Sequence, residues 1–165
     1  MHGRRLGQLF LAAVLVFAVA APAAAGGRDH ERKADTTFGS FVTLAGGEGL
    51  GYTITGRAMM WRTHRHGGTT VVKVHVRGLD ATTEYPTHVH NAPCSTDPAG
   101  GTHYQHTVGG PVDAVNEIWP TVTTNAAGNG HGSARHDNWA RPDAMSIVIH
   151  NPADTSIRLA CADLN

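Results

Sequence analysis

Several histidines in this sequence are spaced so that they could bind one metal ion. Twelve of the 165 residues are histidine. His88 and His90 flank a single valine, so on a strand both imidazoles would point to the same face, about 7 Å apart. His150 ends the run Ser146-Ile147-Val148-Ile149, and His103 lies in a glycine-flanked segment. Imidazole is a common metal ligand, so all four are candidate ligands, although two histidines on a solvated face would also explain His88 and His90.

Short strands, not helices, are expected to position these side chains. Val72, Val74 and Val76 alternate with polar residues, which is the pattern of a half-buried strand. No stretch keeps an apolar 3.6-residue period over three turns, and the short strands do not show the spacing of βαβ units. We therefore predict an all-β fold, an antiparallel barrel or sandwich. The eight expected strands span residues 37–44, 51–61, 69–77, 85–90, 120–124, 130–138, 145–150 and 156–162.

A long connection separates the fourth expected strand from the fifth. The span from Ala92 to Trp119 contains no credible strand. A connection of this length in a compact domain is usually functional or disordered. Because this one contains histidines, we expect it to be functional.

The N-terminus has the features of an export signal. Arg4 and Arg5 precede an apolar stretch over residues 9–21, which is too short to span a bilayer, and small residues follow it. We predict a signal peptide over residues 1–25, with a membrane anchor as the alternative. A loose polar segment, 26–35, and one domain, 36–165, would follow.

Cysteine content and charge narrow the class of protein. Cys94 and Cys161 are the two cysteines, and in an exported chain they are expected to form a disulfide, the alternative being two free thiols. Lys+Arg and Asp+Glu both number 13, so without the two leader arginines the balance is 11 − 13 = −2. A nucleic-acid-binding protein would usually be basic. With 41% hydrophobic and 16% charged residues, the chain is not compositionally disordered.

Five short motifs follow one another along the chain. They are Gly78-Leu79 with His88-Val89-His90 ten residues on, Cys94, Gly100-Gly101-Thr102-His103-Tyr104 with one inserted threonine, Ser146 to His150, and Arg158-Leu159-Ala160-Cys161. Taken in this order, they resemble the motifs of the copper/zinc superoxide dismutase family. The fourth motif resembles the strand that ends in the family's last copper histidine, and the fifth resembles its active-site arginine and second disulfide cysteine. The resemblance covers roughly residues 50 to 164 and implies an eight-stranded Greek-key barrel.

The resemblance implies a role for each matching residue. Superoxide would reduce Cu(II) and leave as dioxygen, and a second superoxide would oxidise Cu(I) and become hydrogen peroxide. His103 matches the histidine that bridges copper and zinc and carries a proton, so it would be catalytic as well as a ligand. Arg158 would hold the anion beside the metal, although a surface arginine is the alternative. The copper ligands would be His88, His90, His103 and His150.

The zinc site of the family is not preserved. Its aspartate position falls near Ile118 and its second loop-histidine position near Val115, and neither side chain can bind zinc. The only nearby side chains that could do so are His106, Asp113 and Glu117. Zinc is therefore a doubtful cofactor, while copper is the expected one.

A second departure concerns the loop that covers the metal in the family. Only seven residues separate His150 from Arg158, where the family has a long charged loop. Both departures resemble the copper-only branch, in which a glutamate orients the bridging histidine. Glu117 is our candidate for that role, and an ordinary solvated loop acid is the alternative.

We therefore predict an exported copper-dependent superoxide dismutase. The alternative is a non-catalytic copper-binding or copper-buffering protein on the same scaffold, because fold does not decide function. The expected partner is superoxide as a small-molecule substrate, with no nucleic acid and, after signal cleavage, no membrane. A monomer in a secreted, periplasmic or cell-wall location is our default expectation.

Overall fold

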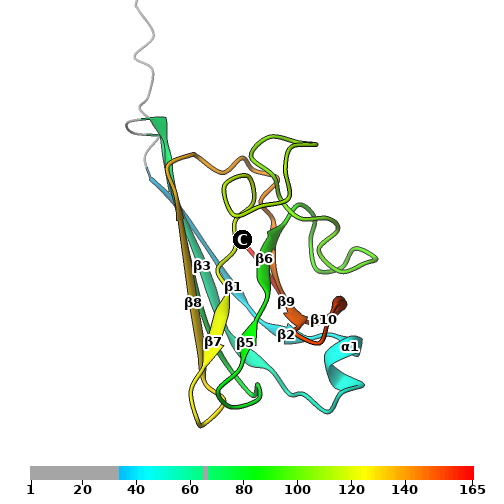
Figure 1. Cartoon of the computed structure of the whole chain (residues 1–165). Coiled ribbons are helices and arrows are strands. Elements are labelled where there is room, and N and C mark those ends of the chain that lie inside the picture. Colours follow the sequence, from blue (N-terminus) through cyan, green and yellow to red (C-terminus); the bar gives the residue numbers. More distant parts are fainter. Residues whose placement is uncertain (1–33, 65–66) are drawn as a thin grey trace, which may run out of the picture.

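In the computed structural model, ten antiparallel strands among the described residues form two sheets that face each other (Figure 1). The structure describes residues 34–64 and 67–165. The six-stranded sheet contains, in spatial order, β1 (Asp35–Ser40), β3 (Thr55–Thr63), β4 (Thr69–Arg77), β8 (Gly130–His136), β7 (Val122–Thr124) and β5 (Glu84–Tyr85). The four-stranded sheet contains β2 (Val42–Thr43), β10 (Asp154–Asp163), β9 (Ser146–Asn151) and β6 (Thr87–His90).

The prediction of an all-β antiparallel fold is confirmed. Four strands of the six-stranded sheet lie in the spatial order β4, β8, β7, β5. In this order β8, the last of the four along the chain, lies beside β4, the first, which is a Greek-key arrangement. Two expected strands are each divided, which accounts for ten strands instead of eight. Phe41 separates β1 from β2 and Pro86 separates β5 from β6, and at both points the chain passes from one sheet to the other. Pro86 has no amide hydrogen to continue a ladder, so a break there is expected.

The core lies between the two sheets. Val72, Val74 and Val76 of β4 are buried, as their alternation predicted, and Ile147 and Ile149 of β9 belong to the same apolar cluster. Outside this core, a short helix α1 (Ala45–Glu48), which the sequence did not predict, packs against β10. The alternate residues of β6 and β9 therefore point away from this core, on the other face of the four-stranded sheet.

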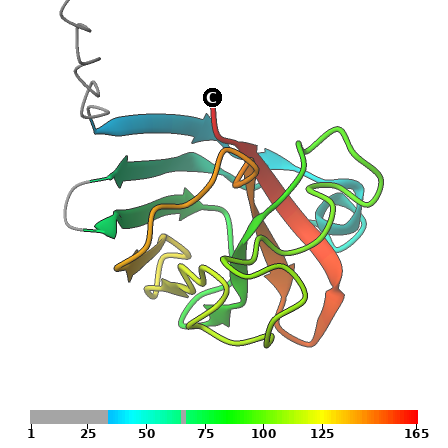
Figure 2. The same ribbon diagram turned by 90° about the horizontal axis from the view of Figure 1, so that it is seen from above.

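The connection from β6 to β7 lies beside the four-stranded sheet in both views (Figures 1 and 2). Its few ladder contacts are isolated bridges, His90 to His103 and Gln105 to Glu117. The predicted signal peptide lies outside the described residues, as does the segment 26–35 except for residues 34 and 35. Asp35 already belongs to β1. None of the helices in the described ranges has the length and apolar character needed to cross a bilayer.

Candidate metal centre

Two strands of the four-stranded sheet supply three of the candidate ligands. Val89 of β6 points into the core, so His88 and His90, one residue to either side, point to the opposite face. The same alternation applies to β9, where Ile149 is in the core and His150 follows it. β6 pairs with β9 so that His88 lies across from Val148. The strand period therefore brings all three imidazoles to one face of the sheet.

The long connection supplies the fourth imidazole by adding to the free edge of β6. The amide of Asn91 donates to the carbonyl of Thr102 at 2.9 Å, and the amide of Tyr104 donates to the carbonyl of Val89 at 2.9 Å. The Tyr104 side chain is fully buried. Between these two backbone bonds, His103 is held opposite His90.

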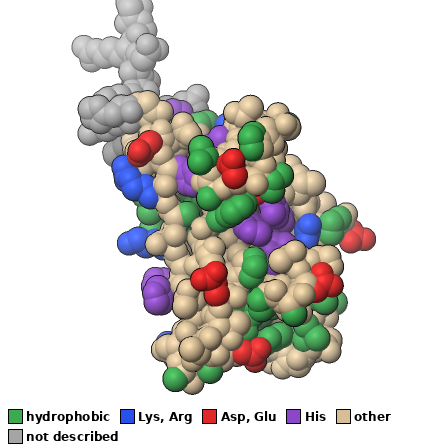
Figure 3. All heavy atoms as spheres, in the orientation of Figure 1, with side chains coloured by type: hydrophobic (Ala, Val, Ile, Leu, Met, Phe, Trp, Pro, Cys, Tyr) green, Lys and Arg blue, Asp and Glu red, His purple; other side chains and the backbone are tan. Residues whose placement is uncertain are grey.

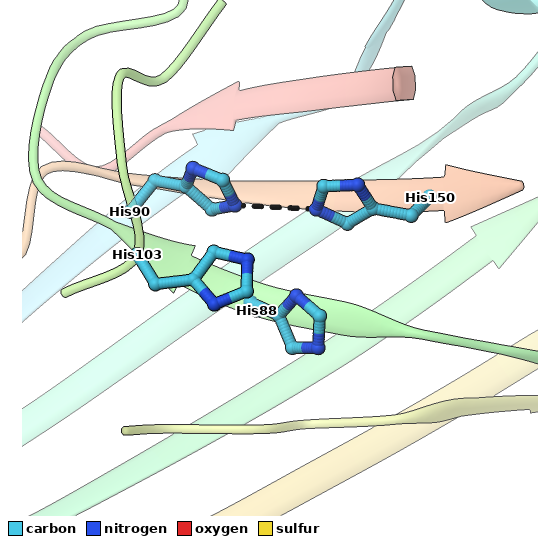
Figure 4. Close-up of side chains that lie close together, drawn as sticks. All are labelled: His88, His90, His103 and His150. Carbon is cyan, nitrogen blue, oxygen red and sulfur yellow. Dashed lines mark hydrogen bonds between the residues drawn. The ribbon is translucent and has the colours of Figure 1, made fainter. Parts of the chain in front are cut away.

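Four imidazoles converge, with one nitrogen of each within 4.8 Å of the others (Figure 4). The Nε2 atoms of His90 and His150 are 3.2 Å apart. Imidazole nitrogens bind a first-row metal ion at about 2.0–2.1 Å, so neighbouring ligands stand ~3 Å apart and opposite ligands ~4.1 Å apart. The widest separation therefore needs to shrink by about 0.7 Å to close around one ion. The four residues of this centre are His88, His90, His103 and His150.

Burial keeps His88, His90 and His150 neutral near pH 7 because it lowers the pKa of each imidazole. It lowers the pKa of His88 to about 3 and, with the nearby charges of His103 and Arg158, the pKa of His150 to about 4. The pKa of His90 is lowered even further, again chiefly by burial. A neutral imidazole has a lone pair for a metal. In the described part of the chain, the buried Nδ1 of His88 has no hydrogen-bond partner, and a bound ion would satisfy it.

Two of the imidazoles are oriented by acceptors behind them. The Nδ1 atom of His150 lies 2.7 Å from the carbonyl oxygen of Thr155. That of His103 lies 2.6 Å from Oε2 of Glu117. A carbonyl or carboxylate oxygen accepts, so each Nδ1 carries the hydrogen, and each Nε2 has its lone pair available for a metal.

The Glu117 carboxylate is almost completely buried, with 1% of its surface exposed. Besides His103, it accepts hydrogen bonds from Nε1 of Trp119 at 2.9 Å and Nε2 of Gln105 at 3.1 Å. The indole ring of Trp119 also contacts His88, with ring centroids 5.5 Å apart. Glu117 is therefore not a solvated loop acid, the alternative considered above, because its carboxylate is buried. The three donors offset the cost of burying this charged group.

Arg158 lies across the β9–β10 ladder from His150. Its guanidinium donates from Nη1 to the carbonyl of Ala99 and from Nη2 to that of Gly101, the latter at 2.8 Å. Its positive charge contributes to the lowered pKa of His90. Both carbonyl partners of Arg158 belong to the long connection between β6 and β7.

The predicted disulfide is confirmed. Cys94 and Cys161 are bonded, with Cα atoms 5.8 Å apart and a sequence separation of 67. The amide of Cys94 also donates to Oδ1 of Asp163 at 2.7 Å. Both links join the start of the long connection to β10, the strand of Arg158.

The other two candidate zinc ligands do not join the four histidines. His106 Nδ1 lies 3.3 Å from the Tyr104 hydroxyl, and its ring is 5.1 Å from that of His136. Asp113 accepts hydrogen bonds from the amides of Val115 and Asn116. Among the described residues, the centre is the only group of three or more His, Cys, Asp or Glu side chains close enough to share an ion.

Sequence reasoning missed Trp119 and Gln105 as partners of Glu117. For Trp119 a weak signal existed, because it lies two residues after Glu117 and would share its face in extended backbone. For Gln105 no local signal existed, because its contact depends on the pairing of residues 105 and 117.

Histidine side chains reach the surface on the face drawn in Figure 3. His88 and His103 are partly exposed, whereas His90 and His150 are buried. No thiolate is present, and imidazole ligands suit zinc, copper, iron and nickel. The centre can therefore hold a transition metal that a small solute reaches from outside. A scan of protein-family models and a search of curated proteins gave no match to this chain.

Proposed function

We propose that this chain is an exported copper-dependent superoxide dismutase of the copper-only type that its motifs resemble. The observation that carries the proposal is the pairing of four convergent imidazoles with a cation, Arg158, held by the carbonyls of Ala99 and Gly101. A storage site has no need of a cation beside its metal, whereas an enzyme acting on an anion does.

Copper is the metal that best fits these ligands and this substrate. Imidazole accommodates copper in both oxidation states, and four nitrogens are a suitable set for Cu(II). When bound, copper would supply one-electron chemistry: one superoxide gives up its electron and leaves as dioxygen, and a second takes that electron and two protons to become hydrogen peroxide. Zinc has no redox chemistry and would not support this reaction.

Arg158 would bind the anionic substrate. Its guanidinium remains charged at any relevant pH, and two backbone carbonyls limit the positions it can take. A superoxide ion attracted to it would lie next to His90 and His150. The turn between β9 and β10 contains only residues 152 and 153, so this turn is too short to cover the approach.

His103, oriented by Glu117, would hold a proton beside the substrate. His103 holds a hydrogen at Nδ1 against Glu117 Oε2, and this contact leaves Nε2 free to bind either an ion or a proton. His103 is also partly open to solvent, from which protons can be replaced. In this proposal Glu117 keeps the ring oriented in the way that zinc does in the two-metal members of the family.

Export is part of the proposal. Residues 1–25 have the pattern of a signal peptide, and the Cys94–Cys161 disulfide is typical of an oxidising compartment.

The test is an activity assay on copper-loaded protein in the presence of EDTA, which suppresses catalysis by free copper. We expect wild-type turnover far above that of the same copper concentration in buffer. Arg158→Ala should retain one copper and lose turnover several-fold. The matched control is Arg135→Ala, which removes the same charge from an exposed position on β8.

Two outcomes would contradict the proposal. Tight binding of one copper with turnover no better than free copper would favour a copper-buffering protein. Failure to bind copper stoichiometrically, measured by metal analysis after loading with copper and zinc together, would exclude both functions.

A further inference from the structure

Trp119 contacts the metal centre in two places. Its indole ring packs against His88, with centroids 5.5 Å apart and an interplanar angle of 53°. Its Nε1 donates to Oε2 of Glu117 at 2.9 Å. That same oxygen lies 2.6 Å from Nδ1 of His103. One side chain thus touches one ligand directly and a second ligand through a single carboxylate oxygen.

The shared oxygen restricts how the carboxylate can turn. Oε2 of Glu117 receives two donors, and Oε1 receives Gln105 Nε2 at 3.1 Å. The Glu117 amide is in turn bonded to the carbonyl of Asp113 at 2.8 Å. Without the indole N–H, Oε2 would keep His103 as its only partner, and only the Gln105 bond to Oε1 would oppose a rotation of the carboxylate that preserves the His103 bond.

We propose that Trp119 is a positioning residue, whose indole N–H fixes the Glu117 carboxylate and thereby sets the orientation of the His103 ring at the metal. The inference deepens the proposed function and depends on it for its effect on turnover. A hydrogen bond to a buried charged group contributes more than one between neutral groups. Since His103 is partly exposed, its own packing does not restrain it as fully as that of His90.

A purely structural role for Trp119 would need only its ring. The decisive variant therefore replaces Trp119 by 3-benzothienylalanine, which keeps the bicyclic shape and lacks the N–H. Trp139 is the matched control, since its ring stacks on His64 and lies near Arg62, away from the four histidines. Both replacements are made in the full chain.

The first measurement uses metal-free protein and NMR. The indole N–H of Trp119 should exchange slowly with solvent, and its resonance should move on Glu117→Gln while that of Trp139 does not. A Trp119 resonance that ignores this substitution would overturn the inference. This measurement does not require the protein to bind copper or to have any activity.

The second measurement uses copper-loaded protein. We expect the Trp119 analogue to bind one copper, to show a changed Cu(II) EPR spectrum and to lose turnover several-fold, while the Trp139 analogue matches wild type. An unchanged spectrum and unchanged turnover in an active protein would overturn the positioning role and leave the proposed function intact. If wild type has no turnover above free copper, the proposed function fails. In that case a changed EPR spectrum of the Trp119 analogue would support the positioning role, and a spectrum identical to that of wild type would overturn it.

Discussion

Acidification should destabilise the metal-free protein through the buried histidines of the metal centre. Burial, together with the nearby charges of His103 and Arg158, holds the pKa of His150 at about 4, against a partly opposing hydrogen bond to Thr155. In the unfolded chain the pKa returns to about 6.5. Between these pH values the unfolded chain binds more protons than the folded one. The contribution of His150 to the free energy of unfolding is therefore fully present above pH 6.5 and is lost as the pH decreases toward 4.

The size of the effect follows from the pH interval. Between pH 6.5 and pH 5, protonation of the imidazole stabilises the unfolded chain but not the folded one. Over these ~1.5 pH units, the free energy of unfolding falls by about 2 kcal/mol for one histidine. His150 is 3% exposed, so little solvent is available to reduce this penalty. His90 is fully buried and should add a loss in the same direction.

The assay is urea unfolding in EDTA at pH 7 and at pH 5. His150→Asn removes the titrating ring and keeps a side-chain N–H donor for the Thr155 carbonyl. Between pH 7 and pH 5, the free energy of unfolding of this variant should therefore decrease by about 2 kcal/mol less than that of wild type. His131→Asn, at an exposed position on β8, is the control for the loss of any histidine. Equal losses in wild type and His150→Asn would refute the reasoning, because the buried ring would then not determine the pH dependence.

Three further predictions concern the surroundings of the centre. Glu117→Gln should lower copper affinity or turnover about 10–100-fold, as measured by competition with a chelator and by the activity assay. Replacing Cys94 and Cys161 by alanine should reduce the free energy of unfolding by about 4 kcal/mol, because the bond closes a loop with a separation of 67 residues; a change below ~1 kcal/mol in urea unfolding would contradict this. Gly101→Ala should destabilise the protein by about 1–3 kcal/mol, because φ is +69° and the new Cβ would lie 2.7 Å from the Cβ of Ala92; unchanged unfolding would show that the loop relaxes.

Local patterns in the sequence were sufficient for the strands and for part of the site. Val72, Val74 and Val76 alternate with polar residues because one face of β4 packs against the core, and this pattern is visible without coordinates. The spacing of His88 and His90 placed them on one face for the same reason. Only one disulfide was possible for two cysteines.

The divisions of two expected strands were harder to predict. Val42 and Thr43 continue a β-rich segment, and nothing local indicates that they pair with β10 instead of β3. Which sheet a short strand joins depends on partners more than a hundred residues away, and those partners are not encoded in the segment itself.

The centre as a working unit was decided by the tertiary structure. The sequence by itself identified candidate ligands, a candidate glutamate and a candidate arginine, because their residue types limit what chemistry they can do. The tertiary structure decided that Glu117 is buried against His103 and Trp119 and that Arg158 is held by loop carbonyls. Such contacts arise only when the long connection folds back along the edge of β6, since hydrogen bonds depend on distances and directions that no local pattern specifies.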